Sequence, residues 1–195
     1  VNYSAYVALD RVAKNLKMMS PDTYRELVQS NGLSLDPTDD LGKDTNWQSE
    51  VQRTGVSHNH NVAISGGHGK TSYNASLNYF NNQGVIKGDD LTRYIGRAFV
   101  TTSALNDRLD LSFNIGASVT EQNQVPDYAD GASVYDAMNY YLPFSPVKNE
   151  DGTWFEHASR TQYYNPVALI EENTNYTKTK RLQASAKAKL LLLPG

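Results

Sequence analysis

The chain has 195 residues and no cysteine, and its formal net charge is only -3. The charge excludes a strongly basic nucleic-acid binder, and the lack of cysteine excludes disulfides, thiolate metal sites and cysteine catalysis. No window of 18 apolar residues is present, which excludes a transmembrane helix. The 13 tyrosines and the abundant Asn, Ser, Thr and Gly favour strands and turns, and so an all-β protein.

The N-terminal part of the chain predicts one strand and one helix. Residues Val1 to Ser4 show neither a Met nor the regions of a signal peptide, so we expect a processed chain or a piece of a longer one. Apolar residues then alternate with polar ones over 3–9, which predicts a strand. After it, Ser20 is a good N-cap, Pro21 suits the first helical position and Gly32 can end a helix.

The middle of the chain predicts four strands in two pairs. Strands at 61–65 and 71–80 are joined by a glycine-rich turn, and strands at 93–102 and 109–119 by the turn 106–108. The last of these alternates strictly, with Leu, Leu, Phe, Ile, Ala and Val at its odd positions. The strand at 93–102 is the least regular, because Ile95 and Phe99 fall on the same face as two arginines.

The C-terminal part predicts a long loop and a final strand. The loop 122–164 contains an expected hairpin at 146–155, where Asp-Gly supplies the positive φ angles of its turn. Alternation over 182–190 predicts the sixth strand, and Leu193-Pro194-Gly195 begins another tight turn.

Turn lengths and strand lengths together predict the fold class. Tight turns join the strands at one end, whereas long or irregular connections join them at the other, as in outer-membrane barrels. The strands have roughly 9–15 residues, which matches or exceeds the ~9–11 that cross a membrane obliquely. We therefore predict an all-β antiparallel meander, part of a large transmembrane β-barrel, with one short helix in a loop.

No candidate motif for catalysis or for metal binding has the residues and the spacing that its chemistry requires. Gly69-Lys70-Thr71 resembles the end of a phosphate-binding loop, but Ile64 replaces the upstream glycine and a strand follows instead of a helix. His58 and His60 would share one strand face, yet too few further ligands are available for a metal. The acidic run from Asp36 has Leu41 where a calcium loop needs glycine. We expect no enzyme activity, metal or cofactor.

Aromatic residues gather in the loop 122–164, and they are the candidate residues for binding a ligand or a partner. Such rings can stack on sugars or form an interface, but they can equally hold a large loop together, and the latter is the simpler interpretation. The candidates are Tyr128, Tyr135, Tyr140, Tyr141, Trp154, Phe155, Tyr163 and Tyr164.

Several strings of residues resemble the start of the barrel in SusC/RagA-type TonB-dependent transporters. They are Thr45-Asn46-Trp47-Gln48-Ser49-Glu50-Val51-Gln52-Arg53-Thr54-Gly55, His58-Asn59-His60-Asn61-Val62-Ala63-Ile64-Ser65-Gly66-Gly67, Tyr73-Asn74-Ala75-Ser76-Leu77-Asn78-Tyr79 with Gln83-Gly84-Val85-Ile86, Arg93-Tyr94 with Arg97, and Tyr164-Asn165-Pro166-Val167-Ala168 leading to Arg181-Leu182. In this resemblance, residues 1–195 correspond to the N-terminal portion of the barrel, after the plug.

The resemblance implies a localisation, partners and a function. It implies a plug domain before the chain, a barrel of 22 strands, the cell outer membrane, a SusD-like surface lipoprotein and the TonB complex. It implies uptake of nutrient oligomers, glycans first and peptides second, and no nucleic acid as partner. The alternative hypothesis is a soluble β domain that binds carbohydrate through its aromatic-rich loop; exposed apolar strand faces would distinguish the transporter from this domain.

Overall fold

The computed structural model describes residues 1–128, 132–157 and 160–192, and these residues form six strands and four helices. In chain order the elements are β1 (Asn2–Asp10), α1 (Pro21–Ser30), α2 (Trp47–Val51), β2 (Gly55–His68), β3 (Thr71–Gln83), β4 (Asp90–Ala104), β5 (Leu109–Asn123), α3 (Val134–Tyr140), α4 (Pro166–Glu172) and β6 (Tyr176–Leu190).

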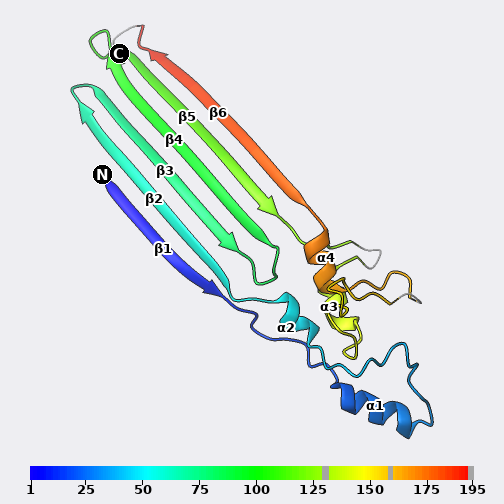
Figure 1. Cartoon of the computed structure of the whole chain (residues 1–195). Coiled ribbons are helices and arrows are strands. Elements are labelled where there is room, and N and C mark those ends of the chain that lie inside the picture. Colours follow the sequence, from blue (N-terminus) through cyan, green and yellow to red (C-terminus); the bar gives the residue numbers. More distant parts are fainter. Residues whose placement is uncertain (129–131, 158–159, 193–195) are drawn as a thin grey trace.

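The strands form a single sheet in the order β1-β2-β3-β4-β5-β6, and each strand is antiparallel to the next (Figure 1). The predicted all-β meander is therefore confirmed, and each of the six strands contains the segment that was predicted for it. The two tight turns are confirmed at 69–70 and 105–108, between β2 and β3 and between β4 and β5. The third expected turn, 193–195, lies outside the described residues.

The two faces of the sheet differ in chemistry. Paired residues of neighbouring strands share a face, so the register assigns each position to one side. Arg93 pairs with Phe80 and Arg97 with Ser76, which places both arginines on the polar face. The opposite, apolar face carries Val62, Ile64, Ala75, Leu77, Ala98, Val100, Phe113, Ile115, Ala117, Leu182, Ala184 and Ala186.

The helices correct one sequence prediction. The expected helix is confirmed as α1, where the Ser20 hydroxyl oxygen accepts from the backbone N–H of Thr23. The described residues add three more helices, so a single helix was too few. These helices have only five to seven residues, and each begins at a capping side chain, Asn46, Ser133 or Asn165. Segments this short do not complete enough turns to show a helical period.

The hydrophobic core lies beside the sheet end and not on either sheet face. We call residues 11–54, 84–89 and 124–175 the loop region; its four helices gather at the end of the sheet opposite the tight turns (Figure 1). Its core cluster consists of Val51, Ile86, Val125, Val134, Ala137 and Leu169. In contrast, Leu77 and Leu182 on the apolar face are 69% and 74% exposed.

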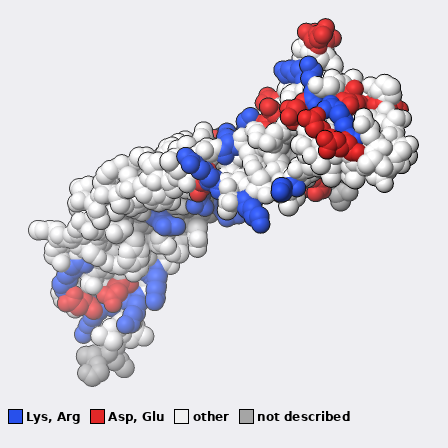
Figure 2. All heavy atoms as spheres, turned by 90° about the horizontal axis from the view of Figure 1, so that it is seen from below, with Lys and Arg blue, Asp and Glu red and all other residues white. Residues whose placement is uncertain are grey.

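On the side seen in Figure 2, acidic side chains gather mainly toward the two ends of the molecule, whereas Lys and Arg side chains also lie between them. One ion pair at the turn end joins Lys70 to Asp107. Within the described parts of the chain, no helix has the length and apolar character needed to cross a membrane.

Candidate functional site

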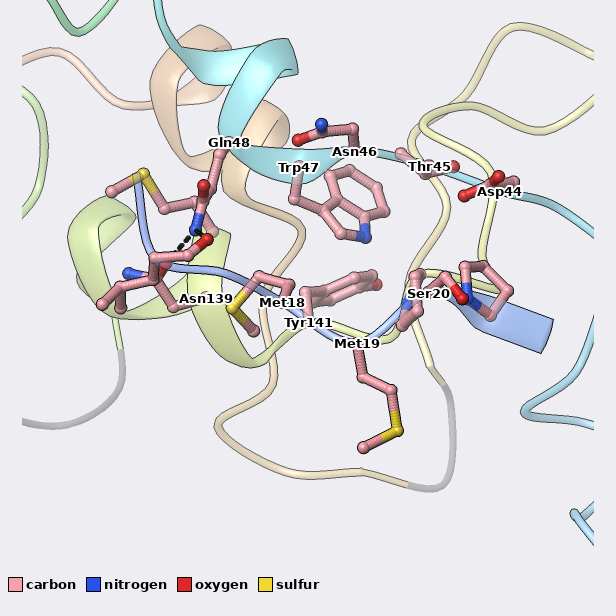
Figure 3. Close-up of a pocket in the computed structure, with 14 residues that line it drawn as sticks. Met18, Met19, Ser20, Asp44, Thr45, Asn46, Trp47, Gln48, Asn139 and Tyr141 are labelled. Atoms are coloured by element: carbon pink, nitrogen blue, oxygen red, sulfur yellow. Dashed lines mark hydrogen bonds between the residues drawn. The ribbon is translucent and has the colours of Figure 1, made fainter. Parts of the chain in front are cut away.

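A pocket of about 290 Å³ opens in the loop region between the segment that follows β1, α2 and α3 (Figure 3). Its lining combines apolar groups with a few polar ones: Leu16, Met18, Met19, Ser20, Pro21, Asp44, Thr45, Asn46, Trp47, Gln48, Met138, Asn139, Tyr141 and Pro143. Met18, Met19 and Met138 are all three methionines of the chain. Residues more than 100 positions apart therefore build one cavity.

Trp47 forms the wall of the pocket at the start of α2. The Asn46 side chain accepts from the backbone N–H of Ser49, which starts the helix there. The Trp47 indole N–H donates to the Leu142 carbonyl at 2.9 Å, and its ring meets the Tyr141 ring edge-on with centroids 4.8 Å apart. These contacts bury both rings and fix the indole against the chain that follows α3.

Hydrogen bonds connect the three segments around the pocket. The Gln48 amide donates to the Asn139 side-chain oxygen at 2.7 Å and to the Leu16 carbonyl at 3.3 Å. The Thr45 hydroxyl donates to the Ser145 carbonyl at 2.6 Å. Because α2, α3 and the segment after β1 are tied together in this way, the pocket walls have a defined arrangement.

Four of the predicted aromatic residues meet in one cluster. Tyr141 and Tyr163 are stacked with centroids 4.5 Å apart, and Tyr140 lies 5.5 Å from Tyr163. Phe155 joins this cluster through the ring of His157. Burial is the main reason that the pKa of Tyr163 is raised to about 12 and that the pKa of Tyr141 also lies above its ordinary value. Only Tyr141 among the predicted residues lines the pocket.

The other four predicted residues lie apart from this cluster. The Tyr135 hydroxyl donates to Asp89 at 3.0 Å, and Trp154 lies under the Lys148 ammonium, 4.1 Å from the ring centroid, in the expected hairpin. Tyr128 and Tyr164 are exposed. The eight residues therefore do not form one surface, and their role in binding stays a prediction.

A buried cluster beside the aromatic rings has the residue types of a hydrolase triad. The Ser145 hydroxyl and His157 Nε2 are 2.9 Å apart, and His157 Nδ1 is 3.5 Å from Asp39. Burial, the main cause, lowers the pKa of His157, while Asp39 opposes this shift and Arg160 adds to it. Ser145 is fully buried, so its hydroxyl has no access to a substrate; the cluster instead joins Asp39 to His157 and Arg160.

The residues of the remaining candidate motifs make contacts with other side chains of the protein. His58 and His60 pack edge-to-face on the apolar face, and His60 also stacks on Tyr79. In the acidic run, Asp40 accepts two hydrogen bonds from Arg25, which lowers the pKa of Asp40 to about 2. No group of three or more His, Asp or Glu residues suited to a metal ion is found among the described residues.

Sequence reasoning missed the pocket because its residues carry no local pattern. Trp47 and Gln48 were part of the family resemblance but were not recognised as a site. Met18 and Met19 lie in a segment without regular structure, and Met138 lies on a helix too short to be predicted. The one usable signal was that the chain has only three methionines, two of them adjacent.

Comparison with solved structures defines the class of protein. The fold matches a structure of the RagAB peptide transporter with a TM-score of 0.76, over 99% of this chain and 26% of that one, at 14% sequence identity. A RagAB peptide importer in its closed-closed state matches with a TM-score of 0.75. The chain thus has the fold of a segment of a large antiparallel barrel of the RagA kind.

Sequence comparison specifies the family. No model of a protein family matches the chain. It is 31% identical over 182 residues to the TonB-dependent receptor SusC of Bacteroides thetaiotaomicron, which covers 90% of this chain and 18% of that receptor. It is 32% identical over 123 residues to the TonB-dependent receptor P26 of Formosa agariphila, covering 62% of this chain and 12% of the relative. The chain belongs to the SusC/RagA-type TonB-dependent receptors, and it spans less than a fifth of these relatives.

Proposed function

We propose that residues 1–195 form the N-terminal portion of the barrel wall of a TonB-dependent transporter in the cell outer membrane. The observation that carries this proposal is the sheet with two chemically different faces. Its apolar face is exposed over the five strands β2 to β6, with Leu77, Phe113 and Leu182 at least half exposed. Apolar patches this extended are rare on soluble proteins and typical of surfaces that meet a partner or lipid.

The height of the apolar face fits a bilayer. On β5 it runs from Leu109, beside the tight turn, to Val119, which pairs with Tyr94 at the aromatic row of His60, Tyr79 and Tyr94. Ten steps of about 3.4 Å correspond to about 34 Å along the strand. A strand tilt of about 40° reduces this to about 26 Å, close to the apolar band of about 25 Å in outer-membrane barrels, which aromatic girdles flank.

The polar face supports a role in solute passage. Asn74, Asp110, Asn114 and Lys187 lie on it, and such side chains suit a water-filled lumen. In this proposal the full-length protein takes up an oligomeric nutrient, a glycan or a peptide, with a SusD-like lipoprotein and the TonB complex as partners. The chain performs no chemistry, and the loop region lies at the cell surface. The RagAB relatives, described as peptide importers, favour a peptide as cargo.

A pair of spin labels on β3 tests the orientation of the sheet. Leu77 lies on the apolar face and Asn74 on the polar face, three positions away. Because the chain has no cysteine, Leu77→Cys and Asn74→Cys can be labelled in the full-length protein, with any cysteine elsewhere replaced, and reconstituted in liposomes. We expect the Leu77 label to collide with oxygen dissolved in the bilayer, and the Asn74 label with a water-soluble nickel chelate.

The opposite result would contradict the proposal. Equal access of the nickel chelate to both labels would mean that the apolar face is not in lipid. Fractionation of cells that make the full-length protein gives an independent reading, since the proposal requires the protein in the outer membrane.

A further inference from the structure

We propose that the pocket lined by Met18, Met19 and Met138 binds one apolar side chain of an extended peptide, which makes a peptide the cargo of this transporter. The inference rests on the proposed function and specifies its substrate class. It starts from the observation that every methionine of the chain lines this one cavity. Methionine side chains are unbranched and adapt to differently shaped apolar groups, which is why they recur at binding surfaces that accept many ligands.

Most polar groups around the pocket already form hydrogen bonds within the protein. The Trp47 indole N–H, the Gln48 amide and the Thr45 hydroxyl each donate to another protein group. The Asn46 side chain caps α2, and the Ser20 hydroxyl bonds to Thr23. What remains for a ligand is mostly thioether and hydrocarbon, so the cavity favours an apolar group over a hydroxyl-rich one.

The aromatic residues of the pocket disfavour a sugar. A glycan platform needs an exposed ring face on which a sugar can stack, together with free hydrogen-bonding groups. Trp47 and Tyr141 are each only 3% exposed, because they pack against one another. Met18 and Met19, in contrast, line the pocket and are 51% and 45% exposed. Met18 lies beside Tyr141, whereas the Met19 side chain extends away from Trp47 and Tyr141 toward solvent (Figure 3).

The volume of the pocket and the charge at its edge limit further the kind of ligand that it can bind. The volume of about 290 Å³ lies at the lower limit for small-molecule sites, so it suits part of an oligomer and not the whole. Asp44 lies at the edge of the pocket, and its exposed carboxylate can accept from a backbone N–H of the bound peptide (Figure 3). Because the methionine side chains adapt to apolar groups of different shape, we expect the pocket to accept a leucine, methionine or phenylalanine side chain of the peptide.

A matched pair of peptides tests this inference. The probes are acetylated and amidated heptapeptides, Gly-Gly-Ser-Leu-Ser-Gly-Gly and the same peptide with serine at the centre, each with a fluorescent label. Binding to the full-length protein in detergent is followed by fluorescence anisotropy. We expect the leucine peptide to bind about tenfold tighter, since burial of such a side chain is worth at least that factor.

Variants at the pocket opening locate the preference. The double variant Met18→Glu with Met19→Glu places carboxylates in a segment without regular structure, so it does not disrupt a helix or strand. We expect it to reduce the tenfold preference to less than twofold. Leu33→Glu is the matched control, because Leu33 is also exposed in the loop region but does not line the pocket; it should keep the full preference.

Three outcomes would overturn the inference. They are equal binding of both peptides, a leucine preference that survives in the double methionine variant, and displacement of the leucine peptide by maltoheptaose in a methionine-dependent manner. Each is compatible with an outer-membrane location and with lipid-facing labels at Leu77, so failure of the peptide pocket is distinguishable from failure of the proposed function.

Discussion

At the scale of single residues, the loop region depends on buried polar side chains that each serve several segments. Asn165 is fully buried at the start of α4, and its side-chain oxygen accepts from the backbone N–H groups of Val167 and Ala168. Its amide donates to the carbonyls of Val147 and Phe155, on both strands of the small hairpin. One side chain therefore starts a helix and fixes a hairpin.

We expect Asn165→Ala to destabilise the loop region by about 2–4 kcal/mol. The change removes an N-cap, worth about 1 kcal/mol, and leaves two carbonyls without their donor at about 1–3 kcal/mol. Urea unfolding of the full-length protein in detergent, followed by protease cleavage within residues 122–175, measures the change. Asn173→Ala, at the exposed end of the same helix, is the control and should cost less than about 0.5 kcal/mol. Equal effects would contradict the role of Asn165.

At the scale of elements, the strands were predictable and most helices were not. Period-two alternation placed the strands at 3–9, 71–80, 109–119 and 182–190, because each separates an apolar face from a polar one. The strand at 93–102 was the least regular, and the strand at 61–65 was predicted from the glycine-rich turn that follows it. Alternation stopped short of the strand ends next to the loop region. There β3 to β5 continue beyond the apolar face as polar segments such as Asn81 to Gln83. Helices α2, α3 and α4 are held by caps and by the packing of residues distant in sequence, and the pocket depends on the same contacts. The packing of distant residues leaves no local pattern. The caps do leave one, since Asn165-Pro166 repeats the kind of start that predicted α1, but these helices are too short to show a helical period.

The junction between the sheet and the loop region provides an element-scale prediction. A Cβ on Gly55, at the start of β2, would lie 2.3 Å from the backbone oxygen of Gln83, at the end of β3. Backbone cannot move aside without breaking the pairing of these strands, so we expect Gly55→Ala to cost about 1–3 kcal/mol. Gly116→Ala is the matched control within β5, because the nearest neighbour of its Cβ is a flexible Arg97 atom 4.0 Å away.

The two glycine variants are compared by thermal unfolding of the full-length protein in the same detergent. Gly116→Ala should stay within about 0.5 kcal/mol of the unaltered protein. A Gly55→Ala protein as stable as the Gly116→Ala protein would show that the close approach at the junction is not maintained.

At the scale of the whole molecule, the sheet alone lacks the partners that its surfaces need. Both faces are open, and strands β1 and β6 each leave an unpaired edge. The only cluster of buried apolar residues in the described part of the chain belongs to the loop region. Long unpaired edges and exposed apolar faces lead to association in water. The physical unit of stability is thus larger than these 195 residues.

This arrangement predicts how the isolated chain behaves. We expect residues 1–195 to aggregate in buffer and to stay dispersed in detergent micelles, as measured by sedimentation and size-exclusion chromatography. Replacing Leu77, Phe113 and Ile115 on the apolar face by threonine should reduce the need for detergent, because about 25 cal/mol is gained for each Å² of apolar surface no longer exposed to water. Threonine at Asn74, Ser112 and Asn114, on the polar face, should leave it unchanged. A monodisperse monomer in plain buffer would instead support the soluble carbohydrate-binding domain, since lipid would then have no part in covering the apolar face.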